Sequence, residues 1–183
     1  MKTVAFIPVR GGSKSIPGKN ILPFNGKPLL YWTAKAAQDC PEISEIIVAT
    51  DSEEIAHTAQ GLGLTKVVVF WRSAENANDK ASTESVMLEY LEKSSLQSND
   101  RFILIQATNP FLQTKHLQDG IEKLKAQPQG SIISCATFKR FLWNRNGTAM
   151  NYDFMNRPRR QDFDGALLDR KSTRLNSSHS SVS

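Results

Sequence analysis

The segment RGGSKSIPGKN, residues 10–20, combines three cationic side chains with three glycines and directly follows an apolar stretch. Glycines let backbone N–H groups converge on an anion, and Arg10, Lys14 and Lys19 supply positive charge that suits a triphosphate. The spacing is not that of the P-loop, because Lys19 is followed by Asn20 instead of Ser or Thr. It is not the dinucleotide fingerprint either, which has glycines at other offsets. We therefore predict a triphosphate-binding loop of another kind; the alternative is a solvated basic turn.

Two further groups of polar residues could do chemistry. RPRRQ, residues 157–161, carries three guanidinium groups, which can grip a carboxylate in bidentate fashion or can form a surface cluster without a ligand. Asp51 ends the apolar segment SEIIVATD. Its carboxylate could contact a ribose or a metal, or it could cap the helix that follows. The sequence leaves both pairs of alternatives open.

The elements that must position these residues alternate between apolar strands and amphipathic helices. The strands end near residues 9, 49, 71, 106 and 138, and helices are predicted over residues 27–40, 52–63, 82–93 and 114–127. Continuously apolar strands, each followed by a helix, predict an α/β fold with three α/β/α layers and a mainly parallel sheet. Such sheets bind ligands at the carboxyl ends of their strands, so the loops there should form the site.

Length and amino-acid composition indicate an ordinary globular domain. The 183 residues suffice for one well-buried domain, and no apolar run approaches the length of a membrane span. The opening residues MKTVAFIPVR contain Pro8 and no small-residue cleavage site, which favours a first strand over a signal peptide and predicts a cytoplasmic protein. Cys40 and Cys135 lack the spacing of metal ligands and are predicted to be buried small hydrophobic residues.

The last fifteen residues differ in kind from the rest. Six of the final thirteen are serine, and no apolar periodicity is present, which predicts a disordered or foreign tail over residues 169–183 after a domain over residues 1–168. Without the tail, 20 basic and 17 acidic side chains remain, so the net charge falls from +5 to +3. That charge is too small to indicate a nucleic-acid partner.

Several segments, in order along the chain, resemble the acylneuraminate cytidylyltransferases, which make CMP-sialic acid and related CMP-nonulosonates. They are the first loop RGGSKSIPGKN, then GKPLLYWT, VATDSEEIA, the region 72–83, LIQATNPFL and NRPRRQDFDGAL. The related enzymes that activate the eight-carbon sugar Kdo have a different first loop, with Arg-Leu-Pro-Gly-Lys. The resemblance covers about residues 2–168, and it implies a nucleotide-diphospho-sugar transferase-like fold.

The resemblance implies roles for the nucleotide-binding side chains. The first loop would wrap the triphosphate through Arg10, Gly12, Ser13, Lys14, Lys19 and Asn20, with Arg10 and Lys19 as catalytic cations at the α-phosphate. Arg72, Asp79, Ser82 and Thr83 lie in the stretch that resembles the base-binding region, where a carboxylate or hydroxyl near the cytosine amino group would favour CTP over UTP. Ser82 or Thr83 could equally be a helix N-cap.

The sugar-binding side chains follow from later motifs. Gln106 matches the glutamine of the family motif L-Q-P-T-S-P, although this chain has Gln-Ala-Thr-Asn-Pro there, so the usual proline and serine are replaced. Arg159 is implied as the ligand of the sugar carboxylate, with Arg160 and Gln161 beside it and Lys139 supplied across a dimer interface. A homodimer is therefore expected, with CTP and a nonulosonic acid as substrates.

The implied reaction is attack of the anomeric C2 hydroxyl of the sugar on the α-phosphorus of CTP, with release of pyrophosphate. Family members hold Mg²⁺ with downstream aspartates that lie beyond the last matching segment, so no metal ligand is assigned here and impaired turnover is expected. Two alternatives stay open: another sugar nucleotidyltransferase, which would prefer UTP or GTP, and a catalytically dead nucleotide-binding fragment. The sequence does not select among nonulosonic acids.

Overall fold

The computed structural model describes residues 1–12, 16–77, 81–127 and 130–176. The chain divides into two compact units, which are taken separately below. The first unit consists of Met1–Ile132 together with Thr173–Ser183, of which the described part ends at residue 176. The second unit is Ile133–Ser172. The expected domain over residues 1–168 stays a prediction.

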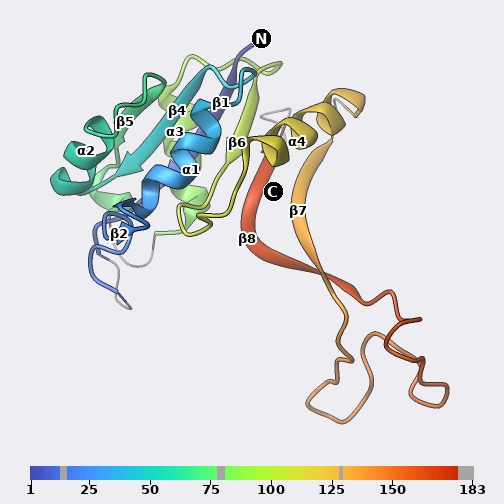
Figure 1. Ribbon diagram of the computed structural model, residues 1–183. Coiled ribbons are helices and arrows are strands. Elements are labelled where there is room, and N and C mark those ends of the chain that lie inside the picture. Colours follow the sequence, from blue (N-terminus) through green and yellow to red (C-terminus); the bar gives the residue numbers. More distant parts are fainter. Residues whose placement is uncertain (13–15, 78–80, 128–129, 177–183) are drawn as a thin grey trace. The chain divides into compact units, whose positions relative to one another are not determined.

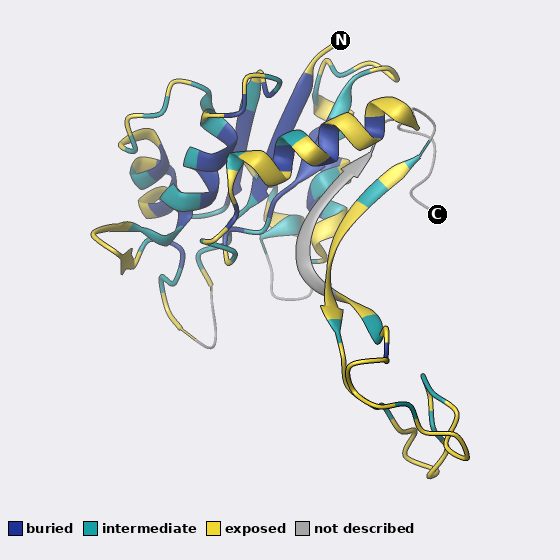
Figure 2. Cartoon of the chain, turned by 45° about the vertical axis from the view of Figure 1, so that its right-hand side comes forward, coloured by how far each residue is buried: buried dark blue, intermediate teal, exposed yellow. Residues whose placement is uncertain are grey.

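The first unit is built on four parallel strands. They are β1 (Thr3–Pro8), β4 (Glu45–Thr50), β5 (Val67–Trp71) and β6 (Arg101–Leu104), in the spatial order β5-β4-β1-β6. In register, Phe6 of β1 lies beside Ile47 of β4 and Leu104 of β6. The central strands are almost wholly buried, as their apolar sequences require (Figure 2).

Helices cover both faces of this sheet (Figure 1). They are α1 (Leu29–Gln38), α2 (Glu53–Gln60), α3 (Thr83–Lys93) and α4 (Thr114–Ala126). The side chains of β1 alternate between the two faces: Ala5 and Ile7 pack in one core cluster with residues of α1, α2 and α4, whereas Val4 and Phe6 pack in the other with residues of α3. The predicted three-layer α/β/α fold with a mainly parallel sheet is confirmed.

Two short elements complete the first unit. A hairpin of β2 (Pro23–Phe24) and β3 (Lys27–Pro28) turns at Asn25 and Gly26, which both have positive φ, as a tight two-residue turn requires. A 3₁₀ turn, η1 (Ala74–Asn76), follows β5. Among the described residues, no helix has the length and apolar character that crossing a membrane would need.

The expected boundary at residue 168 lies inside a strand. Strand β8 (Ala166–Asn176) crosses it, and its end pairs antiparallel with β6, with Leu104 beside Arg174 and Phe102 beside Asn176. Backbone N–H and C=O groups make this pairing, and every residue but proline carries both groups. A strand can therefore form here although its sequence shows no apolar periodicity. Residues 177–183 lie outside the described part of the chain.

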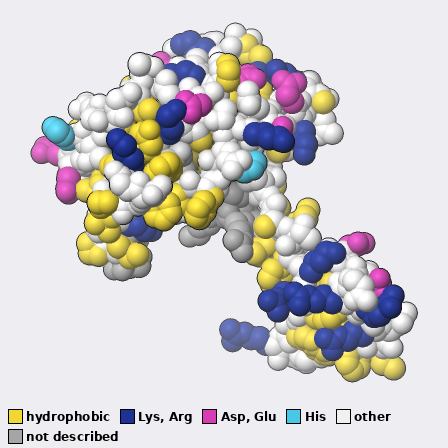
Figure 3. All heavy atoms as spheres, viewed as in Figure 1, with side chains coloured by type: hydrophobic (Ala, Val, Ile, Leu, Met, Phe, Trp, Pro, Cys, Tyr) yellow, Lys and Arg dark blue, Asp and Glu magenta, His cyan; other side chains and the backbone are white. Residues whose placement is uncertain are grey.

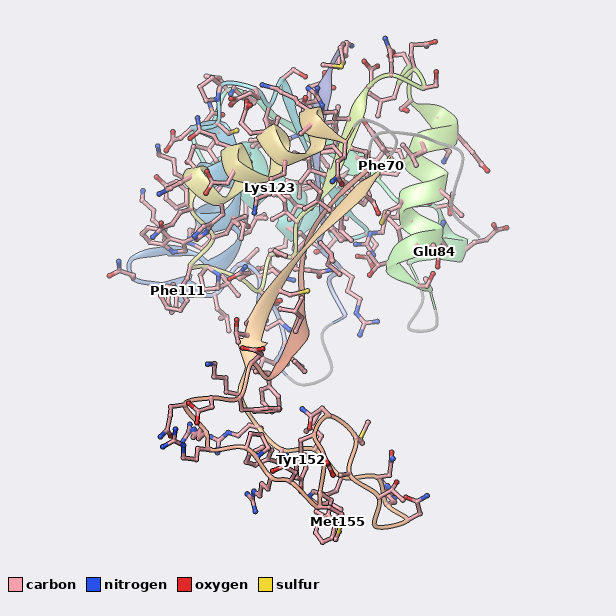
Figure 4. All side chains as sticks on the ribbon, turned by 90° about the vertical axis from the view of Figure 1, so that its right-hand side faces the viewer. Phe70, Glu84, Phe111, Lys123, Tyr152 and Met155 are labelled. Atoms are coloured by element: carbon pink, nitrogen blue, oxygen red, sulfur yellow. The ribbon has the colours of Figure 1, made fainter. Side chains whose placement is uncertain are left out.

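The second unit contains most of β7 (Ser131–Phe138), the part of β8 up to Ser172 and an aromatic cluster. The ring centroids of Phe141 and Phe163 are 4.8 Å apart, and Tyr152 packs against Phe141 at 4.5 Å. Figure 4 shows Tyr152 inside this unit and Met155 at its periphery. A turn lies at residues 145–147, with φ of 83° at Gly147. The cluster gives these irregular residues a small apolar core of their own.

The two cysteines have opposite environments. Cys40, after α1, is fully buried, as predicted. Cys135 was expected to be buried too, but it is exposed on β7, and that expectation is wrong. The reason is that almost every side chain of this strand is exposed, so its apolar sequence does not report burial.

Candidate functional site

The carboxyl ends of the parallel strands carry the candidate residues of the first unit. The backbone ties these strand ends together: Val9 N donates to Ala49 O at 2.8 Å, Arg72 N to Thr50 O at 3.0 Å, and Ile105 N to Phe6 O at 2.8 Å. Arg10, Asp51, Arg72 and Gln106 follow directly after these pairs. One edge of the sheet therefore presents two guanidinium groups, a carboxylate and an amide.

Asp51 fixes the start of the first loop. Its Oδ1 accepts a hydrogen bond from Gly11 N at 2.9 Å, although the two residues are forty positions apart. The next residue, Ser52, is the N-cap of α2 and accepts from Ile55 N at 3.4 Å. The cap of the helix is Ser52, so the capping role expected of Asp51 is not observed, and its carboxylate accepts from the backbone of the first loop. The alternative contact with a ribose or a metal stays a prediction.

Arg72 is half-buried beside these groups. Its Nε donates to Ala49 O at 3.0 Å, and its two Nη groups have no hydrogen bond among the described residues. Burial lowers the pKa of Arg72, the negative charges of Asp51 and Glu89 raise it, and the positive charge of Arg10 lowers it. Because arginine stays protonated in proteins, Arg72 places a permanent positive charge here. Its Nη groups are available to a ligand.

The first loop turns sharply before it reaches the hairpin. Gly18 has φ of 61°, Ile21 N donates to Gly18 O at 2.9 Å, and Lys19 N donates to Ile16 O at 3.2 Å. Lys19 is half-buried and Gly12 is exposed, whereas Ser13 and Lys14 lie outside the described residues. The part of the loop that is described thus has the tight, glycine-dependent form expected of it.

Asn20 is the most distinctive residue of this loop. Its side chain is only 8% exposed, and its Oδ1 has no hydrogen-bond partner among the described residues. The backbone around it is satisfied, since Leu30 N donates to Asn20 O at 2.9 Å. A buried acceptor without a donor costs about 1–3 kcal/mol, so this oxygen is suited to a donor group that a ligand or water brings.

The residues expected to bind the base differ in where the structure places them. Ser82 Oγ accepts from Ser85 N at 3.0 Å, so Ser82 is the N-cap of α3, the alternative that the sequence had offered. Thr83 is the first residue of that helix and is exposed. Asp79 lies outside the described residues. Arg72 is therefore the one member of this set whose side chain the structure places at the strand ends.

Gln106 lies half-buried at the end of β6, where it begins a loop that leads to α4. Its carbonyl oxygen accepts from Asn109 N at 3.1 Å, and Asn109 O in turn accepts from Leu112 N at 3.1 Å. Phe111 protrudes from this loop and stacks edge-on against Phe24 of the hairpin, with ring centroids 6.1 Å apart (Figure 4). The loop after β6 thus carries both Gln106 and the exposed aromatic side chain of Phe111.

Apart from Gln106, the expected sugar-binding residues lie in the second unit and are exposed. Lys139, Arg160 and Gln161 reach solvent, and Arg159 Nε pairs with Asp162 Oδ2 at 2.7 Å. Cationic side chains gather over this unit (Figure 3). From residue 139 to residue 164 the sequence has six Lys or Arg against three Asp. The sugar-binding role of these residues stays a prediction.

Sequence reasoning missed one side chain near the site. Glu89 lies on the buried face of α3 beside Tyr90 and contacts the segment after Arg72. A signal was available, because a glutamate on the apolar stripe of an amphipathic helix needs a partner. Among the described residues, no group of three or more His, Cys, Asp or Glu side chains could hold a metal ion.

The chain is similar in sequence to known cytidylyltransferases. A family model described as "Cytidylyltransferase" matches residues 4–156. N-acylneuraminate cytidylyltransferase of Oncorhynchus mykiss is 35% identical over 172 residues, which are 90% of this chain and 39% of that protein. Pseudaminic acid cytidylyltransferase of Campylobacter jejuni is 32% identical over 178 residues, which are 92% of this chain and 75% of that protein. The chain thus spans about two fifths of the Oncorhynchus relative.

Solved structures share the fold. CMP:2-keto-3-deoxy-manno-octonic acid synthetase complexed with CTP aligns with a TM-score of 0.70 at 21% identity, covering 97% of this chain and 74% of that one. The 4-diphosphocytidyl-2C-methyl-D-erythritol synthase of Anaerococcus prevotii aligns with a TM-score of 0.66 at 16% identity, covering 96% and 70%. At these identities the likeness concerns the fold alone.

Proposed function

Because this chain belongs to the cytidylyltransferase family, we propose that it binds CTP at the carboxyl edge of its sheet and transfers CMP to a nonulosonic acid. One observation carries the proposal: a cationic strand edge in which Gly11 N is bonded to Asp51 and the charges of Arg10 and Asp51 both act on Arg72. The loop after β1 also contains Asn20, whose buried Oδ1 has no partner among the described residues. This arrangement suits a triphosphate, which needs fixed cations and backbone donors.

The chemical step is a nucleotidyl transfer. The anomeric C2 hydroxyl oxygen of the sugar forms a bond to the α-phosphorus, the bond from that phosphorus to the bridging oxygen breaks, and pyrophosphate leaves while the hydroxyl loses its proton. Arg10 and Lys19 neutralise charge that develops on the phosphate oxygens. Positioning and charge neutralisation account for most of the catalysis of such transfers, so these two cations are the proposed catalytic residues.

The roles at the base and the sugar are part of the same proposal. Arg72 would face the cytosine or its ribose with its open Nη groups, and Gln106 would face the sugar. Arg159 would grip the sugar carboxylate in bidentate fashion, with Lys139, Arg160 and Gln161 nearby. The relatives named for N-acylneuraminate and for pseudaminic acid support a nonulosonic acid as the substrate class.

Magnesium is expected from the family; among the described residues, no group of three or more His, Cys, Asp or Glu side chains could hold a metal ion. Asp51 lies at the strand ends, where one of its two carboxylate oxygens accepts from Gly11 N. No catalytic step is therefore assigned to a metal that these residues hold.

A nucleotide panel tests the proposal directly. Melting temperature is measured with CTP, UTP, ATP or GTP, because a ligand that binds the folded state raises it by mass action. We expect a rise that is selective for CTP, that is largely lost in Lys19→Met, and that persists in Lys115→Met, a matched change on the exposed surface of α4. A rise with UTP or GTP instead, or equal rises with all four nucleotides, would contradict the assignment.

We also propose a homodimer in which the second unit is the contact. Its large apolar side chains are unusually exposed: Phe154 by 59% and Met155 by 86%. Replacing both by serine should convert a dimer to a monomer in sedimentation equilibrium. Leu88→Ser, at an exposed leucine of α3, is the control and should leave the mass unchanged. A wild-type chain that sediments as a monomer at micromolar concentration would refute the dimer.

A further inference from the structure

Glu89 is the one buried charged residue among those that the structure describes, with 8% of its surface exposed. It lies on α3 between Val86 and Tyr90, both of which belong to the core. Burying a carboxylate is costly unless it is paired and hydrogen-bonded. A buried glutamate on an otherwise apolar helix face therefore requires an explanation.

Three donors satisfy the carboxylate. Ser73 N donates to Oε1 at 2.9 Å, Asn76 Nδ2 donates to Oε2 at 2.7 Å, and Lys93 Nζ contacts Oε1 at 2.7 Å. Two of these three donors belong to the segment 73–76, which follows Arg72 without a break. The side chain of Glu89 therefore joins α3 to the loop that leaves the end of β5.

The ion pair with Lys93 does not by itself explain the burial. Lys93 is one turn further along α3, its side chain is 58% exposed, and its ammonium lies 5.7 Å from the centroid of the Phe70 ring. Because both residues belong to α3, this pair joins the helix only to itself and leaves the loop after Arg72 untouched. The hydrogen bonds from Ser73 and Asn76 can form only when the carboxylate is buried between α3 and the loop.

Those bonds fix the backbone on one side of Arg72, and the neighbouring strand fixes the other. Arg72 N donates to Thr50 O at 3.0 Å, and its Nε donates to Ala49 O at 3.0 Å. With Ser73 N held by Glu89, the peptide groups before and after Arg72 are both fixed. The open guanidinium face is thus presented in a single orientation.

We propose that Glu89 is a positioning residue for nucleotide recognition: it anchors the segment 73–76 so that Arg72 is held ready for the nucleotide. The inference rests on the proposed function, because it assumes that Arg72 contacts CTP. It goes beyond that function by assigning a role to a side chain that does not reach the ligand. A purely structural glutamate would affect stability and leave nucleotide affinity unchanged.

Two measurements separate these roles. The dissociation constant for CTP is measured by calorimetry well below the melting temperature, and hydrogen exchange of the peptide covering residues 72–77 is measured on the nucleotide-free chain. Glu89→Gln keeps the shape of the side chain but removes its charge and turns one acceptor into a donor that faces Asn76 Nδ2 or Ser73 N. We expect CTP binding to weaken by about tenfold and exchange in 72–77 to accelerate by about tenfold.

Two variants are matched controls. Lys93→Met removes the ion pair but keeps both bonds to the loop, and Glu92→Gln changes an exposed glutamate on the same helix. Both should leave the dissociation constant and the exchange rate within about twofold of wild type. If Glu89→Gln does not fold, Asn76→Ala carries the test, because it removes one loop bond from the other side and should weaken CTP binding by about threefold.

A Glu89→Gln chain that melts earlier but keeps wild-type CTP affinity and wild-type exchange would overturn the inference. Failure of the proposed function is distinguishable from this result. If the wild-type chain binds no nucleotide, the proposed function fails, and exchange then decides the anchoring alone: faster exchange in the variant supports it, and unchanged exchange overturns it.

Discussion

The backbone N–H of Gly11 donates to Oδ1 of Asp51 at 2.9 Å and joins the loop after β1 to the loop after β4. The two loops pack closely here: a Cβ atom added to Gly11 would lie 2.9 Å from Ser52 Cβ. Glycine is needed at this position for close approach, while the carboxylate sets where the approach occurs. The loop that we propose binds the triphosphate thus starts from a fixed point.

Gly11→Ala should lower the free energy of unfolding by about 1–3 kcal/mol, because the added methyl group must push apart two loops that a hydrogen bond holds together. Gly12→Ala is the matched control, since an added Cβ there meets nothing within 4 Å. Urea denaturation of the two variants measures the difference. Equal stability of both would show that the Gly11 contact relaxes without cost.

Asn20→Leu should weaken CTP binding without lowering the stability of the nucleotide-free chain. Leucine is of similar size and removes a buried acceptor that has no donor among the described residues, so the nucleotide-free chain should be as stable as wild type or up to about 1 kcal/mol more stable. CTP binding should weaken by about tenfold if a nucleotide group or its bound water satisfies this oxygen. Thermal melts with and without CTP test both halves. A destabilised apo chain would mean that Oδ1 already has a partner.

The pH dependence of stability should contain a contribution from Glu89. Desolvation acts to raise the pKa of this carboxyl, but hydrogen bonds from Lys93, Asn76 and Ser73 outweigh it and lower the pKa from 4.5 to about 2. The unfolded chain therefore binds more protons between these values, and the stabilisation, on the order of 2–3 kcal/mol, is present above pH 4.5 and is lost as pH falls toward 2.

Glu89→Gln should lack this component. The difference in unfolding free energy between wild type and variant, measured by urea denaturation, should shrink as pH falls from 5 toward 3. A difference that stays constant over this range would argue that Glu89 titrates normally in the folded chain.

The two thiols should react at very different rates. Burial raises the pKa of the Cys40 thiol to about 11, and Cys135 is exposed on β7. A thiol reagent at pH 8 should label Cys135 within seconds to minutes and Cys40 only as the chain opens. Cys135→Ser should remove the fast phase, and Cys40→Ser should leave it intact. A fast phase that survives Cys135→Ser would place Cys40 within reach of solvent.

Much of this architecture follows from the sequence. Continuously apolar strands such as TVAFIP leave few alternatives to a parallel sheet covered on both faces, and the glycines and cations of residues 10–20 mark the loop that suits a triphosphate. Ser52 and Ser82 are helix caps that local pattern alone could propose. These features depend on neighbours within a few residues or on simple periodicity.

The tertiary structure decided the remaining assignments. Local pattern allowed Asp51 to cap a helix, but the cap is Ser52, and Asp51 accepts from an amide forty residues earlier in the chain. Glu89 accepts a hydrogen bond from Ser73, sixteen residues earlier in the chain. Strand β8 forms where it pairs with β6. Each of these contacts joins segments that are distant in sequence. A carboxylate could accept a hydrogen bond from many different donors in the chain. Which donor it receives is settled only when the packed core brings the segments together.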